Sequence, residues 1–298
     1  MIDVALLNQQ FGIPGVAQVV SGNGGLAAVQ VTASAATGTI YLQGGHVAAW
    51  KPVGAEEVLW CSKASWWEAG KPIRGGVPIC FPWFSNAGTP AHGFARLLPW
   101  ELEAVDERNG EVTVVMSLRS SEATRQYWPH DFLLRHRVTF GAELVMQLEL
   151  TNLGDTPLVA EKAQHTYFHV GDVRQIGITG LENVKYISVV EDVQDKSHAE
   201  AIAIEAETDR RYVNTEGVIV LEDWSLNRLI TLRRYNSQVA VVWNPWVAKA
   251  KAMPDFGDDE WLEMMCIETA NVREFPAKVA PRGMHVMTSR VSVERKEF

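Results

Sequence analysis

Hydrophobic residues alternate with polar ones, or run together over strand lengths, through much of the chain. Such segments are bounded by Gly, Asn, Asp or Pro and cover residues 56–61, 111–118, 132–140, 143–150, 228–235 and 238–243. Alternation with a period of two is typical of strands that bury one face. The pattern predicts an all-β protein of mostly antiparallel strands, arranged as two large sheets packed face to face.

Short connections favour antiparallel pairing of these strands. Gly141-Ala142 joins two of them as a tight hairpin turn, and Arg108-Asn109-Gly110 carries the Asn-Gly turn pattern. Helical periodicity is confined to short pieces at 62–68 and 121–128, which we expect to be connections. No repeat, low-complexity tract or Ser/Gly linker divides the chain, so we expect one catalytic domain over residues 1–298.

Residues 69–99 form the least regular stretch of the sequence. It is rich in Gly and Pro but also contains Phe81, Trp83, Phe84 and Phe94. Segments that stay unfolded are poor in aromatic residues, and long loops in compact domains are usually functional. We therefore expect an ordered loop beside a binding site.

Composition narrows the class of protein. The chain has 298 residues, 47% of them hydrophobic, and 27 Lys+Arg against 36 Asp+Glu give a net charge of −9. Nucleic-acid binding needs clustered cations to meet phosphates, so we expect no nucleic-acid partner. The N-terminus lacks the basic and apolar regions of a signal peptide, and no apolar run is long enough for a membrane span. We expect a cytoplasmic monomer with no membrane partner.

Several familiar motifs are absent or fail in context. Three cysteines, far apart in sequence, indicate neither a disulfide framework nor a zinc knuckle. Residues 22–27 fit a loose dinucleotide-binding pattern, but β-like segments flank them and we interpret them as a hairpin loop. His165 and His169 lie four residues apart in a predicted strand, about 13 Å from each other, which is too far to share a metal. The candidate chemistry that is left after these exclusions is that of carboxylate and imidazole side chains.

The segment 159–169 carries an unusual number of polar groups for a strand. A period of two places Glu161, His165, Tyr167 and His169 on one face. Imidazole donates or accepts a proton at neutral pH better than other side chains, so His165 is a candidate acid or base. A solvated strand or a core histidine with satisfied hydrogen bonds is the alternative.

Glu268 ends an otherwise apolar row in the segment 260–271. An ionised carboxylate there is costly to desolvate, and burial would raise its pKa and make it a better base. The alternatives are a Glu at a solvated strand end or one paired with an Arg for structural reasons.

Two arginines in the irregular loop lie next to glycines. Arg74 precedes Gly75-Gly76, and Arg96 closes His92-Gly93-Phe94-Ala95-Arg96. Two guanidinium groups could hold a phosphate by bidentate hydrogen bonds. Both could instead bridge loop carbonyls.

These segments together resemble a known family. Arg74-Gly75-Gly76-Val77-Pro78, Phe81-Pro82-Trp83-Phe84, His92-Gly93-Phe94-Ala95-Arg96, His165-Thr166-Tyr167-Phe168 and Ile267-Glu268 with Asn271 are similar, in this order, to motifs of the aldose 1-epimerase superfamily. The match is strongest to its hexose-6-phosphate mutarotase branch, also called glucose-6-phosphate 1-epimerase. The resemblance implies a galactose-mutarotase-like β-supersandwich, a sugar-phosphate substrate, and chemistry that needs no metal or organic cofactor.

The same resemblance implies roles for individual residues. By motif, His165 is the general acid and Glu268 the general base, while Arg74, Arg96, His92 and Asp209 bind substrate. Ala91 departs from the Gln that often precedes the His-Gly-Phe-Ala-Arg block, so one polar contact is missing or supplied from elsewhere.

The residue types suit this chemistry on their own terms. Exchange of α and β anomers removes the proton of the C1 hydroxyl and delivers one to the ring oxygen, so it needs a base and an acid. We expect His165 to be protonated when substrate binds, held so by a carboxylate such as Glu161 or by the phosphate.

Two alternative functions stay open at this point, and a third is disfavoured. A glycoside hydrolase would need two carboxylates about 5 to 9.5 Å apart, for which no second motif is present. A non-catalytic carbohydrate-binding protein is favoured by the eleven tryptophans. An epimerase for unphosphorylated aldoses would differ in lacking the anion site.

Overall fold

Three large sheets make up most of the computed structural model, which describes residues 2–297. We call the first the back sheet; from edge to edge it contains β13 (Ile176–Thr179), β17 (Gly217–Asp223), β18 (Arg228–Tyr235), β22 (Met284–Arg295), β9 (Leu144–Asn152), β8 (Phe132–Phe140), β7 (Glu111–Arg119) and β6 (Glu101–Arg108). We call the second the site sheet; it contains β15 (Val193–Lys196), β14 (Tyr186–Ser188), β16 (Thr208–Val213), β19 (Val239–Asn244), β20 (Met264–Asn271), β11 (Lys162–Gln164) and β5 (Ile79–Cys80), with β12 (Tyr167–His169) also paired to β20.

The third sheet and the helices complete the described chain. The N-terminal sheet contains β1 (Ala17–Ser21), β2 (Ala27–Thr32), β3 (Ala36–Tyr41) and β4 (His46–Pro52). A small ribbon pairs β10 (Leu158–Ala160) with β21 (Ala277–Val279). The α-helices of residues 2–297 are α1 (Val4–Phe11), α2 (Glu122–Tyr127) and α3 (Trp246–Ala252). None of the helices in this part of the chain has the length and apolar character that crossing a bilayer requires.

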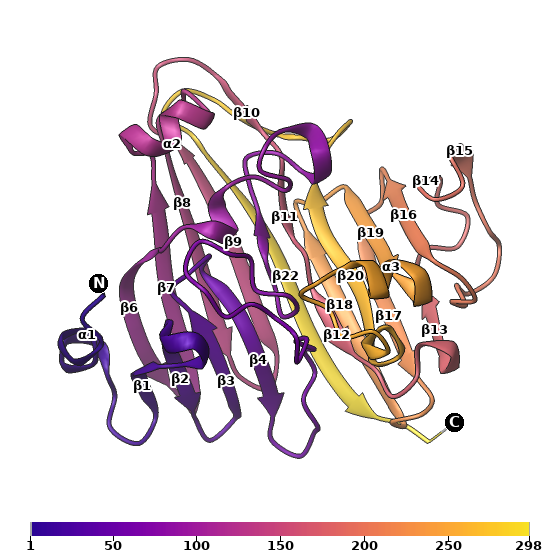
Figure 1. The fold of residues 1–298 in the computed structure, drawn as a ribbon, viewed down its shortest axis with the longest axis horizontal. Helices are drawn as coiled ribbons and strands as arrows, with labels where there is room; N and C mark the ends of the chain where they lie inside the picture. Colours follow the sequence, from indigo (N-terminus) through magenta and orange to yellow (C-terminus); the bar gives the residue numbers. More distant parts are fainter. Residues whose placement is uncertain (1, 298) are drawn as a thin grey trace.

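The back sheet supports both of the others (Figure 1). On the N-terminal side, the Trp50 indole donates to the Gly141 carbonyl at 3.1 Å. On the site-sheet side, Gln164 donates to Met146 O at 3.2 Å and accepts from the Ser289 hydroxyl at 2.7 Å. The predicted face-to-face packing of two large sheets is therefore present, and a third sheet, which the pattern did not separate, shares the front layer.

Strict alternation explains why the predicted back-sheet strands are correct. Along β9, Leu144, Met146, Leu148 and Leu150 are fully buried while the residues between them are partly exposed. β8 and β18 have the predicted bounds, and β7, β9 and β19 differ from prediction by one or two residues at an end. Two connections are also confirmed, because β8 and β9 form a hairpin and Asn109-Gly110, both with positive φ, turn β6 into β7.

Two local predictions are wrong for an identifiable reason. Residues 56–61 form only isolated bridges, because Glu57 Oε1 accepts the backbone N–H groups of Trp50, Val58 and Leu59 and replaces ladder partners. Residues 62–68 contain turns and no helix. There the Ser62 hydroxyl accepts from Ala64 N and donates to Glu260, an alternative to helical hydrogen bonds. The second helical piece is α2, capped by Ser121.

Candidate active site

A cavity of about 510 Å³ opens on the site sheet. Its wall includes five of the six predicted site residues: Arg74, His92, His165, Asp209 and Glu268. The other lining residues are Phe84, Ser85, Asn86, Tyr167, Val189, Arg211, Val241, Trp243, Lys249, Met253 and Arg273. Phe84, Ser85, Asn86 and His92 come from the irregular loop, which is ordered and borders this cavity as predicted.

Strand register brings the polar side chains of the site sheet to one face. Glu268 on β20 is opposite Val241 on β19, which is opposite Arg211 on β16. Residues directly opposite one another point to the same side of a sheet, and each strand spacing is about 4.8 Å. Glu268 and Arg211 therefore project from the same face about 10 Å apart, roughly the length of a hexose phosphate.

His165 and Glu268 are in direct contact at the floor of this cavity. His165 Nε2 lies 3.3 Å from Glu268 Oε1. His165 occupies the break between β11 and β12, where its backbone N–H bonds to Pro78 O and not to β20. The break turns the imidazole toward Glu268, and the ring stacks on that of Tyr167 at a centroid distance of 4.8 Å.

Burial shifts both members of this pair toward their neutral forms. The pKa of His165 is lowered well below its usual value, first by burial, then by its interaction with His92, and further by the positive charges of Arg96 and Arg74. The pKa of Glu268 is raised well above its usual value, first by burial and then by the Asp209 carboxylate. Both shifts favour the uncharged forms, a neutral imidazole beside a carboxylic acid, and in that state the pair holds one proton that either side chain can carry.

The strand pattern predicted for 159–169 is correct for His165 and Tyr167 but wrong for the other two residues. His169 lines a different cavity. Glu161 lies between β10 and β11, where its carboxylate accepts the backbone N–H groups of Phe84 and Arg273, both at 2.6 Å. A period of two does not survive the breaks in this strand, and the carboxylate beside His165 is Glu268, not Glu161.

Arg74 is part of the cavity wall and is held from two sides. Its guanidinium donates to Asp255 at 3.2 Å and to the Tyr167 hydroxyl at 3.0 Å. Burial lowers the pKa of Arg74, but Tyr167 and Asp255 outweigh this effect and raise it overall.

Arg96 is the one predicted site residue that does not line the cavity. Its Nη2 donates to Ala91 O at 2.8 Å, so the departure at position 91 leaves a backbone contact in place. Its charge still acts on the site, because it lowers the pKa of His165 and, against burial, that of Glu268. Burial lowers the pKa of Arg96 itself.

His92 and Asp209 lie on the cavity wall near the pair. The His92 ring is 5.6 Å from the His165 ring, and its Nδ1 lies 3.2 Å from Cys80 Sγ. Burial, helped by Arg96, lowers the pKa of His92 to about 3, so this ring is neutral. Burial raises the pKa of Asp209, and the Lys249 ammonium opposes that effect.

The structure adds lining residues that the sequence did not reveal. Lys249, Arg211 and Arg273 are cations on the cavity wall, and Trp243 and Tyr167 supply aromatic surface. The strand face shared with His165 indicated Tyr167. Nothing in the sequence states the register that brings β16 and β19 beside β20, so Arg211 and Trp243 carried no readable signal. Across residues 2–297, no three His, Cys, Asp or Glu side chains are grouped so that they could hold a metal ion.

Comparison with known proteins identifies the family. The model of the aldose 1-epimerase family matches residues 28–283. A Salmonella typhimurium protein provisionally named glucose-6-phosphate 1-epimerase is 41% identical over 232 residues, which are 76% of this chain and 77% of that protein. The crystal structure of a protein from Salmonella typhimurium, provisionally called a mutarotase, superposes with a TM-score of 0.89 at 34% identity and covers 98% of this chain and 100% of that chain.

A more distant structure shares the fold alone. A galactose mutarotase-like protein from Clostridium acetobutylicum superposes with a TM-score of 0.74 at 13% identity, over 94% of this chain and 98% of that one. The architecture is thus the galactose-mutarotase-like β-supersandwich that the motifs implied. The chain belongs to the aldose 1-epimerase family: it is an isomerase, a mutarotase that interconverts sugar anomers.

Proposed function

We propose that this mutarotase acts on hexose 6-phosphates, with glucose 6-phosphate the first candidate, and that Glu268 is its base and His165 its acid. The observation that carries the substrate class is the charge of the cavity. Four cationic side chains, Arg74, Arg211, Lys249 and Arg273, line it and outnumber its two carboxyl groups, Asp209 and Glu268, in a protein of net charge −9. Three of the cations also form ion pairs with carboxylates outside the lining: Arg74 with Asp255, Arg211 with Glu274 and Lys249 with Glu207. A sugar phosphate brings the anion that such a cavity favours. The provisional name of the Salmonella typhimurium relative agrees with this substrate.

The proton shared by His165 and Glu268 suits ring opening. Transfer of that proton from the carboxylic acid to the imidazole, over 3.3 Å, creates a carboxylate and an imidazolium without changing the total charge of the pair. The carboxylate then takes the proton of the C1 hydroxyl while the imidazolium protonates the ring oxygen. The C1–O5 bond breaks to give the open-chain aldehyde. Rotation about C1–C2 exposes the other face of the carbonyl.

Reclosure runs the same steps in reverse. The ring hydroxyl attacks the aldehyde carbon, the neutral imidazole takes its proton, and the carboxylic acid protonates the carbonyl oxygen. Reclosure leaves a carboxylate and an imidazolium, the forms in which ring opening began, and return of the proton from His165 to Glu268 restores the neutral pair. Entry of the dianionic phosphate favours an imidazolium nearby, which is how substrate binding would bring His165 into its acid form.

Arg74, Arg96, His92 and Asp209 complete the proposal. Arg74 binds the phosphate from the cavity wall, and Arg96 contributes positive potential from behind it. The carboxylate of Asp209 and the neutral ring of His92 hydrogen-bond sugar hydroxyls. An aldose 1-epimerase for unphosphorylated sugars is the competing function, since it needs the same acid and base.

Rates on glucose and on glucose 6-phosphate separate the two functions. Anomer exchange is measured by NMR exchange spectroscopy above the uncatalysed background, in the wild type and in Arg74→Ala and Arg96→Ala. The proposal predicts loss of activity confined to the phosphorylated sugar. Equal rates on both sugars in the wild type would overturn it. Location in the cytoplasm, the monomeric state, the lack of a nucleic-acid partner and the single domain over residues 1–298 stay predictions.

A further inference from the structure

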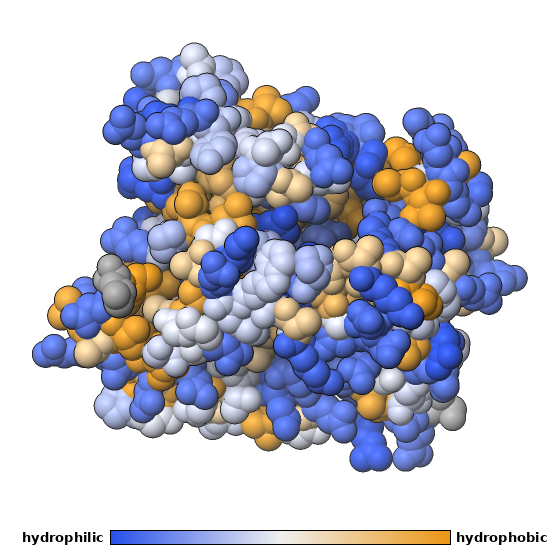
Figure 2. Space-filling view, in the orientation of Figure 1, coloured by the Kyte–Doolittle hydropathy of each residue, from blue (hydrophilic) through white to orange (hydrophobic). Residues whose placement is uncertain are grey.

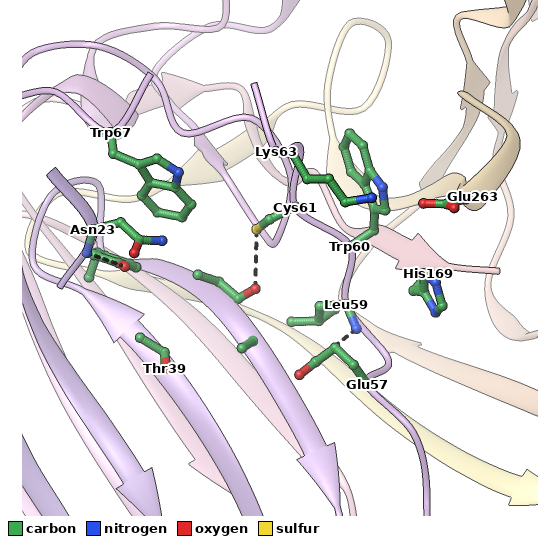
Figure 3. A pocket seen from close by; sticks show the side chains of 13 residues that line it. Asn23, Thr39, Glu57, Leu59, Trp60, Cys61, Lys63, Trp67, His169 and Glu263 are labelled. Atoms are coloured by element: carbon green, nitrogen blue, oxygen red, sulfur yellow. Dashed lines mark hydrogen bonds between the residues drawn. The ribbon is translucent and has the colours of Figure 1, made fainter. Parts of the chain in front are cut away.

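A second cavity, of about 500 Å³, lies between the N-terminal sheet and the segment 57–67. We call it the tryptophan pocket (Figure 3). It shares no lining residue with the cavity of His165 and Glu268. Its wall consists of Asn23, Thr39, Tyr41, Ala48, Ala49, Glu57, Leu59, Trp60, Cys61, Lys63, Trp67, His169 and Glu263.

Aromatic rings form one wall of the tryptophan pocket. Tyr41 and Trp67 pack against each other with ring centroids 5.0 Å apart, and Trp60 lies across the pocket from Trp67 in Figure 3. The loop 22–25 holds this wall, since the Tyr41 hydroxyl accepts from Asn23 N at 3.2 Å. A Cβ on Gly24 would lie 1.7 Å from the Trp67 carbonyl oxygen. Only glycine at this position therefore lets the loop approach Trp67 this closely.

Polar side chains on the walls of this pocket lack protein partners. Within the part of the chain that the structure describes, Asn23, Lys63, His169 and Glu263 make no side-chain hydrogen bond or ion pair. In Figure 3, Asn23 lies on the side of Trp67, while Lys63, Glu263 and His169 lie on the side of Trp60. An aromatic wall facing several free donors and acceptors matches a ligand with an apolar face and a rim of hydroxyls.

We call the cavity lined by His165 and Glu268 the catalytic cavity. The charge of its lining side chains distinguishes it from the tryptophan pocket. The carboxylate, ammonium and imidazole side chains of the tryptophan pocket are Glu57, Glu263, Lys63 and His169. With His169 neutral they sum to about one negative charge, whereas in the catalytic cavity four cations outnumber two carboxyl groups. An anionic sugar phosphate is disfavoured here, and a neutral ring is preferred.

We propose that the tryptophan pocket is a second carbohydrate site that binds one unphosphorylated hexose, stacked on the wall of Trp67. The pocket also touches the catalytic cavity through an aromatic stack. Trp60 lies 5.7 Å from Tyr167, which in turn lies 4.8 Å from His165. This inference goes beyond the reaction proposed above, and only the competition with glucose 6-phosphate in its test rests on the proposed function.

Calorimetric titration with methyl α-D-glucopyranoside tests the inference. This sugar is fixed as one anomer, so it binds without reacting. The titration is performed on the whole protein in saturating glucose 6-phosphate, which occupies the catalytic cavity. The inference predicts that binding of one glucoside per chain persists. It is overturned if glucose 6-phosphate abolishes the binding, or if no binding is detected.

Two neighbouring tryptophans provide a matched pair of variants. Trp67 lines the pocket, whereas Trp66 is exposed beside Lys71 and lies outside it. Trp67→Leu should weaken glucoside binding by about tenfold or more, and Trp66→Leu should leave it unchanged. Glu263→Gln is a second variant, used in case Trp67→Leu does not fold. It changes an exposed side chain of the pocket and should also weaken glucoside binding. Glucoside affinity that is unchanged in Glu263→Gln and in a folded Trp67→Leu would contradict the site.

The reaction serves as an independent readout. Anomer exchange of glucose 6-phosphate should stay within about twofold of wild type in Trp67→Leu and Glu263→Gln, since neither residue lines the catalytic cavity. A wild type inactive on glucose 6-phosphate would overturn the proposed function, and the inference would still stand if Trp67→Leu weakens glucoside binding while Trp66→Leu does not.

Discussion

The hydroxyl of Tyr167 accepts a hydrogen bond from Arg74 Nη1 at 3.0 Å. The same tyrosine ring stacks on His165 with an interplanar angle of 14°. One side chain thus contacts both His165, the proposed acid, and Arg74, a cation of the cavity wall. Trp60, stacked on the other side at 5.7 Å, limits the freedom of the ring to move.

Tyr167→Phe should separate these two roles. The ring keeps its stack on His165, but Arg74 loses one of its hydrogen-bond partners. A hydrogen bond to a charged group contributes about 1.5–3 kcal/mol, so we expect KM for glucose 6-phosphate to rise about tenfold or more with little change in kcat. Steady-state anomerisation kinetics measure both constants.

Tyr212→Phe is the control for that experiment. Tyr212 bonds to His198 at 2.9 Å through its hydroxyl and does not line the catalytic cavity. The control should leave both constants at wild-type values. If Tyr167→Phe lowers kcat and leaves KM unchanged, Tyr167 does not act through Arg74.

The shared proton predicts how kcat/KM depends on pH. A second proton binds the pair only well below the usual pKa of His, because burial lowers the pKa of His165. The last proton leaves only well above the usual pKa of Glu, because burial raises the pKa of Glu268. We expect a bell-shaped profile whose plateau is the one-proton state. A profile that stays flat as the pair titrates would rule out this assignment.

Burial of the Glu268 carboxyl should also lower the free energy of unfolding as the pH rises. Its folded-state pKa is raised, so above pH about 4.3 the unfolded chain releases this proton while the folded chain retains it. The free energy of unfolding therefore falls as pH rises from there through the folded pKa. Glu268→Gln removes this ionisable group. As the pH rises from 5 to 8, a range that begins about 1 unit above the reference pKa of Glu, the thermal melting point of the variant should therefore fall less than that of the wild type.

Burial of Lys162 should have the opposite effect at higher pH, where it should make the free energy of unfolding rise with pH. Its ammonium is fully buried between the back sheet and the site sheet, where it donates to Leu148 O and His285 O. Burial lowers its pKa to about 7. The unfolded chain retains this proton up to a pH of about 10.4, so the free energy of unfolding should rise with pH between these values. Lys162→Met should remove this rise in a denaturation series, whereas Lys51→Met, at an exposed position, should retain it.

Alanine substitutions at two glycines separate the cost of backbone strain from the cost of a steric clash. Gly24 and Gly15 both have positive φ, 61° and 74°. An added Cβ has nothing within 4 Å at Gly15 but meets the Trp67 carbonyl at 1.7 Å at Gly24. Gly15→Ala should cost about 1 kcal/mol of unfolding free energy, and Gly24→Ala about 2 kcal/mol more. Equal losses in chemical denaturation would show that the loop 22–25 shifts freely away from Trp67.

Surface hydropathy does not mark the catalytic site. Apolar groups are scattered over the face drawn in Figure 2, and the central hollow is polar inside with apolar groups on parts of its rim. This agrees with a site that binds by charge and hydrogen bonds, for which local burial is more informative than an apolar patch.

The sequence predicted what depends on local pattern and motif. Alternation along β8, β9 and β18 is complete, so their bounds followed directly. His165, Glu268, Arg74, His92 and Asp209 were found by motif and lie around one cavity. Residues 56–61 were misread because the Glu57 side chain takes over backbone N–H groups, which no periodicity reveals.

Other parts depend on cross-strand register and could not be read from the chain. Arg211 faces the cavity because two strand pairings place it level with Glu268. Arg96 carries a binding motif, yet its guanidinium donates to Ala91 O and does not line the cavity. The break at His165 depends on Pro78 as a backbone partner, 87 positions earlier in the chain.

The most direct test of the account is the rate of anomer exchange of glucose 6-phosphate in Glu268→Gln and His165→Asn, measured by NMR exchange spectroscopy with folding checked by circular dichroism. General acid and base groups each contribute about 10²- to 10⁴-fold, so each variant should lose at least about a hundredfold in kcat. A folded variant of either residue that exchanges anomers as fast as wild type would contradict the account.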